Sequence, residues 1–193
     1  EVGKDYGPAT MPSQLNVIQS HLDDAKAKGA KFLLGGADSV KGTYVEPVIM
    51  LDVPEDSTAM TQETFGPTIA INKVSTTDEA IKLSNASSYG LAAAVFSKRD
   101  GEKIASKLAC GMVSINSVFL FAAVASVPFG GVKDSGYGRI HGAEGLLEYT
   151  YARTVVKTRF NIPLRFTTFK RTRFSEKILT TLIKRLHGRR KKY

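Results

Sequence analysis

The chain has 193 residues, 42% of them hydrophobic and 23% charged, a composition typical of a soluble globular domain. No apolar run is long enough to span a bilayer, and the polar first ten residues do not resemble a secretory signal peptide. A single cysteine excludes an internal disulfide framework and a cysteine-rich metal site, and it fits a reducing cytoplasm.

The net charge of +9 is concentrated at the end of the chain. Residues 159–193 hold 12 lysines and arginines against one acid, Glu176, which gives this tail a charge of +11. Residues 1–158 hold the other 15 basic and 17 acidic residues, a net charge of −2. We therefore predict a nearly neutral body, residues 1–158, followed by a basic tail, residues 159–193.

A helix is predicted over residues 14–27, because apolar residues recur there at helical spacing and Ser13 can cap its first turn. The apolar residues are Leu15, Ile18, Leu22 and Ala25. Three extended segments follow, with the sequences AKFLLGG, TYVEPVIM and TIAINKV. Pro47 argues against a central position for the second segment, and the third is predicted to be a buried strand.

The rest of the body alternates helix and strand. Helix DEAIKLSNA, with Thr77 as its cap, precedes strand LAAAVFS; helix GEKIASKLAC, stopped by Gly111, precedes strand MVSIN. This alternation predicts crossover units, a parallel sheet and an α/β fold. Residues 117–145 contain six glycines without periodicity, which is typical of a functional or packed loop. LLEYTYARTVVKTRF predicts a short helix and then a strand.

Two motifs resemble hallmarks of the aldehyde dehydrogenase superfamily. They are ETFGP at residues 63–67 and PFGGVKDSGYGRIHG at residues 128–142, the second followed by EGLLEYT. NASSYGLAAAVFS and GMVSIN lie between them in the family's order, so the resemblance covers residues 7–158. It implies a parallel-sheet catalytic domain of this family, without the N-terminal cofactor domain and with the start of the oligomerisation strand.

The resemblance implies that Glu63 and Phe65 bind NAD or NADP. In similar enzymes the acid accepts hydrogen bonds from the nicotinamide ribose hydroxyls, and the aromatic ring packs beside the nicotinamide. The chemistry is suitable, because a carboxylate only accepts hydrogen bonds and the Gly66-Pro67 turn can aim it. From the residues alone, the alternative is a solvated acid on a turn, with Phe65 in the core.

The resemblance also places residues near the substrate. Phe129 would line the aldehyde tunnel, and Asn116 matches an asparagine that the family uses near the site; alternatively, Asn116 bonds backbone. Many members carry Arg-Glu-x-Gly where this chain has residues 139–142, RIHG. Ile140 in place of that glutamate puts any proton relay through it in doubt.

We expect no catalytic residue in this chain, because the family's nucleophilic cysteine, general-base glutamate and oxyanion-hole asparagine lie upstream of it. Cys110 is not a substitute, since it is predicted at a helix C-terminus, whose partial negative charge disfavours a thiolate. It is interpreted as a small buried core residue. His21, His141 and His187 lack the spacing of metal ligands, so no metal site is predicted.

The resemblance implies that the parent enzyme oxidises an aldehyde to a carboxylic acid. A thiolate attacks the carbonyl, hydride passes to NAD(P)+, and water hydrolyses the thioester. The chain is then the C-terminal fragment of a cytoplasmic homo-oligomer and is inactive alone. The alternative is a stand-alone, non-catalytic remnant that self-associates or binds a membrane through its basic tail.

The tail predicts an amphipathic helix. Its apolar stripe is Ile178, Leu179, Leu182, Ile183 and Leu186. Such a helix packs on the enzyme's own body or a neighbouring subunit, or it gives residues 170–193 affinity for an anionic membrane. Nucleic acid is the weakest candidate partner, because the tail's phenylalanines precede the helix rather than alternating with its charges.

Overall fold

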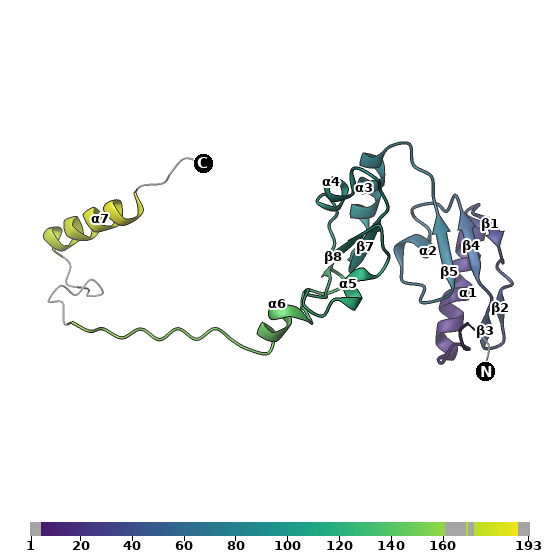
Figure 1. The fold of residues 1–193 in the computed structure, drawn as a ribbon, viewed down its shortest axis with the longest axis horizontal. Helices are drawn as coiled ribbons and strands as arrows, with labels where there is room; N and C mark the ends of the chain where they lie inside the picture. The colour runs from purple at the N-terminus through teal and green to yellow at the C-terminus, as the bar shows by residue number, and fades with distance from the viewer. Residues whose placement is uncertain (1–4, 161–168, 170–171, 189–193) are drawn as a thin grey trace. The chain divides into compact units, whose positions relative to one another are not determined.

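The computed structural model describes residues 5–160, 169 and 172–188 (Figure 1). The chain divides into two compact units, residues 1–151 and 152–193. The boundary predicted from charge, between the nearly neutral body (residues 1–158) and the basic tail (residues 159–193), stays a prediction.

The first unit contains six helices and nine strands among its described residues. The helices are α1 (Pro12–Ala27), α2 (Thr58–Thr61), α3 (Thr77–Ala86), α4 (Gly101–Ala105), α5 (Leu120–Ala123) and α6 (Gly142–Leu147). The strands are β1 (Lys31–Leu34), β2 (Val40–Lys41), β3 (Tyr44–Val45), β4 (Val48–Leu51), β5 (Thr68–Ile71), β6 (Tyr89–Gly90), β7 (Ala92–Val95), β8 (Met112–Ile115) and β9 (Val132–Lys133). The described part of the second unit contains one helix, α7 (Arg173–His187).

The first sheet has the strand order β1-β4-β5 and is packed against α1 (Figure 1). β1 pairs antiparallel with β4, and β4 pairs parallel with β5. The core cluster consists of Ile18, Leu22, Ala25, Val45, Val48, Met50 and Val53. Helical spacing had predicted the α1 contribution, and fully burying a side chain such as Leu22 stabilises the fold by about 2 kcal/mol.

A second parallel pair, β7 and β8, is joined through α4, as the alternation of helix and strand predicted. Its buried apolar residues are fewer: Ile81 of α3, Val95 of β7 and Met112 of β8. β6 pairs antiparallel with β9 and connects the glycine-rich segment to this region. A side chain on Gly111 would collide with the backbone of Gly130, so this close approach requires glycine.

Three helix boundaries differ from the prediction. α3 begins at Thr77, and its N-cap is Thr76, whose hydroxyl accepts from the Glu79 amide at 3.1 Å. α1 begins at Pro12 with Met11 as its N-cap, because proline at the first helical position has a suitable φ and needs no donor. Ser13 lies inside the helix and is not its cap. α4 ends at Ala105, so Cys110 lies in the turn before β8 rather than at a helix end.

The strand predictions need three corrections. β4 is central in its sheet and begins at Val48, directly after Pro47, so the proline lies outside the ladder. β5 is not fully buried, since Ile69 and Ile71 are 54% and 46% exposed. Residues 151–159 form no strand, because no described segment supplies a hydrogen-bonding partner for them.

Candidate functional site

The ETFGP segment forms the loop between α2 and β5. Glu63 is exposed, and the Phe65 ring is 79% exposed, so Phe65 is not a core residue. Phe65 has a φ of 44°, a left-handed conformation that is rare outside glycine. The Thr68 amide donates to the Gly66 carbonyl at 2.8 Å and closes the turn into β5. The loop therefore presents an acid and an aromatic ring, both accessible to a ligand.

α1 holds this loop through buried polar contacts. His21 is 3% exposed, and its Nδ1 and Nε2 lie 3.0 Å from Thr64 Oγ1 and 3.3 Å from Gln62 Oε1. Gln14 Nε2 donates to the Thr64 carbonyl at 2.5 Å. These residues were not among those predicted from the sequence. The available signal was that Gln14 and His21 share a helix face with apolar Ile18.

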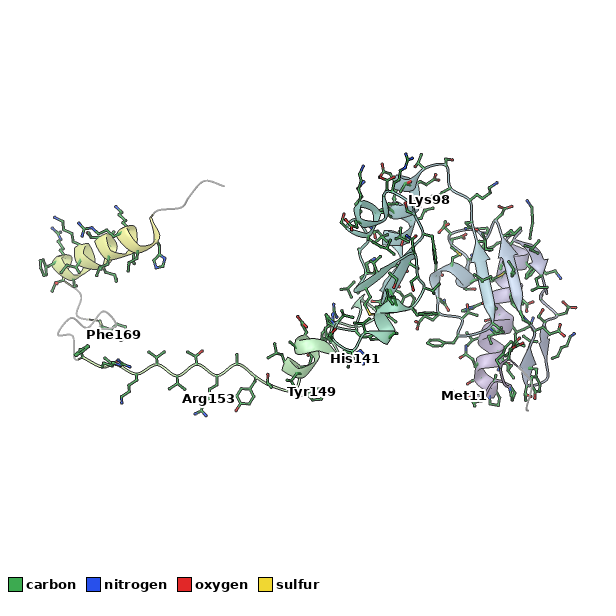
Figure 2. All side chains as sticks on the ribbon, in the orientation of Figure 1. Met11, Lys98, His141, Tyr149, Arg153 and Phe169 are labelled. Atoms are coloured by element: carbon green, nitrogen blue, oxygen red, sulfur yellow. The ribbon has the colours of Figure 1, made fainter. Side chains whose placement is uncertain are left out.

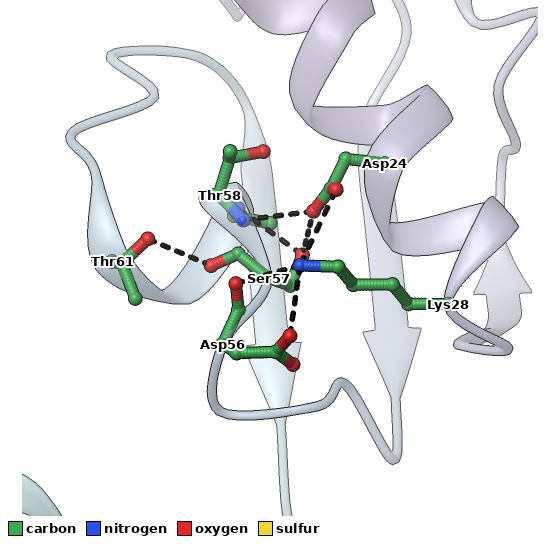
Figure 3. A network of polar contacts seen from close by, with 7 residues as sticks. Asp24, Lys28, Asp56, Ser57, Thr58 and Thr61 are labelled. Atoms are coloured by element: carbon green, nitrogen blue, oxygen red, sulfur yellow. Dashed lines mark hydrogen bonds and ion pairs between the residues drawn. The ribbon is translucent and has the colours of Figure 1, made fainter.

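A second polar network holds the helix that leads into the loop (Figure 3). Asp24 of α1 accepts hydrogen bonds from Ser57 Oγ at 2.7 Å and from the Thr58 amide at 2.8 Å, and Ser57 is the N-cap of α2. Lys28 Nζ lies 3.4 Å from Asp24 and 3.1 Å from Asp56. The hydrogen bonds from Ser57 and Thr58, with the positive charge of Lys28, lower the pKa of Asp24 to about 2.

Glu63 borders a cavity of about 250 Å³ that also reaches the β6–β7 region. Cys110 and Ser135 lie on its wall, whereas Phe65, Asn116 and Phe129 do not line it. Burial raises the pKa of the Cys110 thiol, which donates to the Met112 carbonyl at 3.2 Å. A thiol in this state is a poor nucleophile. The interpretation of Cys110 as a buried core residue is wrong, because the residue is half-buried and lies on the cavity wall.

Phe129 belongs to an aromatic group on the glycine-rich segment. Its ring centroid lies 6.1 Å from that of Phe121 and 6.0 Å from the His141 ring. Two backbone hydrogen bonds, of 2.6 and 2.8 Å, join Phe129 to Ile140. The residue that replaces the family's glutamate thus contributes its backbone here, while its side chain is 52% exposed.

Asn116 uses its side-chain amide on the backbone. Its Oδ1 accepts from the Ser97 amide at 2.9 Å, and its Nδ2 donates to the Ser97 carbonyl at 3.1 Å. Its φ of 55° is a left-handed conformation that asparagine tolerates better than most residues. Asn116 therefore ties the end of β8 to the end of β7.

Among the residues that the structure describes, no group of three or more His, Cys, Asp or Glu could hold a metal ion. None of the helices described is long and apolar enough to cross a membrane.

A family model and individual relatives match most of this chain. The family model described as "Aldehyde dehydrogenase family" matches residues 1–155. A Mycobacterium ulcerans (strain Agy99) protein, named "Putative succinate-semialdehyde dehydrogenase [NADP(+)] 2", is 41% identical over 164 residues, covering 82% of this chain and 32% of that relative. A Methylomonas 4,4'-diapolycopene aldehyde oxidase is 40% identical over 161 residues, covering 82% and 30%.

Solved structures show the same relationship. Betaine aldehyde dehydrogenase from Staphylococcus aureus, in complex with NAD+, superposes with a TM-score of 0.75 at 34% identity, covering 87% of this chain and 34% of that one. Aldehyde dehydrogenase 21 from Physcomitrella patens, in complex with the reaction product succinate, gives 0.68 at 33% identity, covering 76% and 30%. The expected α/β fold is confirmed, and the chain spans about one third of these relatives.

Proposed function

Since the chain belongs to the aldehyde dehydrogenase family, we propose that it is the C-terminal part of an NAD(P)-dependent enzyme that oxidises an aldehyde to a carboxylic acid. The observation that carries this proposal is the accessible acid and aromatic ring of the loop between α2 and β5. The nicotinamide cofactor, when bound, supplies the hydride acceptor.

Glu63 and Phe65 are the proposed cofactor-binding residues. An exposed carboxylate accepts hydrogen bonds from two neighbouring ribose hydroxyls, and no other described side chain competes for the Glu63 oxygens. The exposed Phe65 ring offers a flat apolar surface to the nicotinamide end. Together these groups fit the sugar and the ring of a dinucleotide, and they orient it without carrying out chemistry.

Phe129 is the proposed aldehyde-side wall, and Asn116 lies in the proposed substrate region. The half-buried Phe129 ring, packed beside Phe121 and His141, supplies an apolar surface of the kind that binds a hydrocarbon group. The bonds from Asn116 to Ser97 favour a structural role for this amide, which keeps the β7 and β8 ends together.

The proposed nucleophile is a cysteine outside this chain, so the isolated chain is expected to be inactive. The raised pKa of Cys110 supports this assignment, because a thiol that stays protonated does not attack a carbonyl. NADH or NADPH production with a panel of aldehydes tests it, with Cys110→Ser as the control. Turnover that disappears in Cys110→Ser would contradict the assignment.

A chimera tests the cofactor role directly. Residues 1–155 replace the matching third of the S. aureus betaine aldehyde dehydrogenase, and Glu63→Gln is introduced into the chimera. A charge-assisted hydrogen bond contributes about 1.5–3 kcal/mol, so NAD+ affinity or the hydride-transfer rate should fall by at least about tenfold. Glu102→Gln, an exposed acid of α4, is the matched control and should change neither. Equal values for the two variants would refute the role of Glu63.

Self-association is the proposed quaternary state of the enzyme. Residues 151–159 are extended, and their side chains leave the backbone on alternating sides, as Figure 2 shows around Arg153. Val155 and Val156 are 79% and 86% exposed, and an unpaired extended segment can add to a strand of a second subunit. Light scattering of the chain and of Val155→Lys is the test, and a lower molar mass in the variant is expected.

A second candidate function is attachment of a cytoplasmic enzyme to anionic membranes through residues 170–193. α7 begins with a capping box between Thr172 and Ser175, so its start is fixed by its own side chains. Its apolar residues remain accessible, with Leu182, Ile183 and Leu186 at 43%, 51% and 73% exposure. Basic side chains on the same helix match an anionic lipid surface.

Vesicle co-sedimentation of the full chain and of a chain lacking residues 170–193 tests this attachment. The full chain should pellet with anionic vesicles at low salt and be released at high salt, because the lysine and arginine contributions are screened. Equal pelleting of both forms favours a helix that packs on protein instead. Membrane binding is compatible with an enzyme part as well as with a non-catalytic remnant, so it does not favour the remnant.

A further inference from the structure

The loop that carries Glu63 is held at its two flanking residues by one buried histidine. His21 lies on α1 with 3% of its surface exposed, and both of its ring nitrogens are engaged. Nδ1 lies 3.0 Å from Thr64 Oγ1, and Nε2 lies 3.3 Å from Gln62 Oε1. An amide oxygen only accepts, so Nε2 donates to Gln62, and Nδ1 is then free to accept the Thr64 hydroxyl proton.

Two more residues of the same helix face complete the attachment. Gln14 Nε2 donates to the Thr64 carbonyl at 2.5 Å. Ile18 packs against Gly66, where an added Cβ would lie only 2.9 Å from Ile18 Cδ1. Residues 14, 18 and 21 recur at helical spacing, so they form one face, here called the α1 clamp. The α1 clamp contacts residues on both sides of Glu63 and Phe65.

The loop requires such external support. Phe65 has a φ of 44°, and non-glycine residues keep a left-handed conformation only where the surroundings hold them in it. The Phe65 ring is 79% exposed, so its own packing cannot provide this support. No described side chain holds the exposed Glu63 carboxylate in place. The directions of both side chains therefore follow from the backbone, which the α1 clamp fixes.

We propose that His21 is a positioning residue, which acts through Gln62 and Thr64 to aim Glu63 and Phe65 at the cofactor. The functional part of this statement rests on the proposed cofactor role of these two residues. The mechanical part, that His21 keeps residues 62–66 in one conformation, stands without it. His21 itself touches neither cofactor nor substrate.

Limited proteolysis of the full chain tests the mechanical part. A glutamate-specific protease reports local opening at the Glu63–Thr64 bond, and a lysine-specific protease reports opening of the sheet at the Lys31–Phe32 bond of β1. His21→Ala should raise cleavage after Glu63 about tenfold and leave cleavage after Lys31 unchanged, because it removes local hydrogen bonds. Gln14→Met, which removes one donor at similar side-chain length, should raise the same cleavage less.

Two controls separate positioning from general stability. Leu22→Ala, next to His21 but in the core, should raise cleavage at both bonds. His21→Gln retains a donor and an acceptor and should return the Glu63 cleavage rate to within about twofold of the original. The proposal is overturned if His21→Ala and Leu22→Ala give the same pattern, or if His21→Gln is cleaved as fast as His21→Ala. Because no cofactor is present, these outcomes do not depend on whether Glu63 binds ribose.

Discussion

Residues 5–74 and residues 75–151 each contain a parallel strand pair with helical cover, but they differ in how much apolar surface is buried. The first region contains seven clustered core residues from α1, β3, β4 and the turn after β4. The second has Ile81, Val95 and Met112 as its buried apolar residues. Parallel strands are normally covered on both faces, so the second region is the less complete of the two.

The difference shows what a partial domain retains. α1 and β4 are close in sequence and bury each other, so the first region contains most of its own core. β5 and β7 keep exposed faces, since Ile69 of β5 is 54% exposed and Ala92 and Ala94 of β7 are exposed. Since the chain spans about one third of its relatives, we infer that other parts of those proteins cover the equivalent faces.

The largest expected effect separates the two regions by stability. Leu22→Ala, at 0% exposure in α1, should cost about 3–5 kcal/mol of unfolding free energy, because it leaves a closed cavity. Ile81→Ala, at 9% exposure in α3, should cost about 2 kcal/mol, because its surroundings can relax toward solvent. Urea unfolding measures both. Equal losses would remove the contrast between the regions.

The next effect is a pH dependence that belongs to the first region. Bonds from Ser57 and Thr58 lower the pKa of Asp24 to about 2, below its ordinary 3.8. The resulting stabilisation is complete above about pH 4 and is lost as the pH falls toward 2. In Asp24→Asn, urea midpoints at pH 7, 4 and 2.5 should start lower and fall less. A variant with the original pH dependence would show that other carboxylates are responsible.

A smaller effect is expected at the end of β8. Asn116→Ala removes two hydrogen bonds to the Ser97 backbone, and each such bond contributes about 1 kcal/mol. Residue 116 has a φ of 55°, and alanine lacks the polar side chain that makes this left-handed conformation tolerable for asparagine. Thermal unfolding should show a modest loss, whereas Lys98→Ala, at a nearby exposed side chain without a hydrogen bond to any described residue, serves as the control. A loss as large as that of Leu22→Ala would contradict the contrast between the two regions.

The smallest expected effect is on the rate at which the Cys110 thiol reacts with an alkylating reagent. Burial raises the pKa of Cys110, so less thiolate is present at pH 8 than in an unfolded chain. Iodoacetamide should therefore modify the native chain more slowly than the chain in urea, because a smaller fraction of the thiol is ionised. Equal rates would mean that the turn before β8 opens freely.

Local features of the fold were predictable from the sequence. The buried face of α1 follows from the 3.6-residue spacing of Ile18, Leu22 and Ala25, which involves only neighbouring turns. The exposure of Ile69 and the early end of α4 were not predictable, because both depend on what packs against them. Pro47 was misinterpreted, since a proline directly before a strand leaves the ladder intact.

In the candidate site, too, some features were predictable from the sequence and others were not. Glu63 and Phe65 were named by a motif resemblance, and their roles stay predictions. The residue physics alone favoured Phe65 in the core, which its exposure contradicts. The bond between His21 and Thr64 spans 43 positions, and no local pattern contains that information. It could be suspected only from a polar residue on an otherwise apolar helix face.

The contact between His21 and Thr64 also limits how this sequence can change over generations. A substitution at either position leaves a polar atom of the other without its partner in a part-buried place. Single replacements are thus costly, whereas a paired replacement, such as two apolar residues of matching volume, can be neutral. Positions 21, 62 and 64 are therefore expected to be inherited as a unit and to covary among related chains.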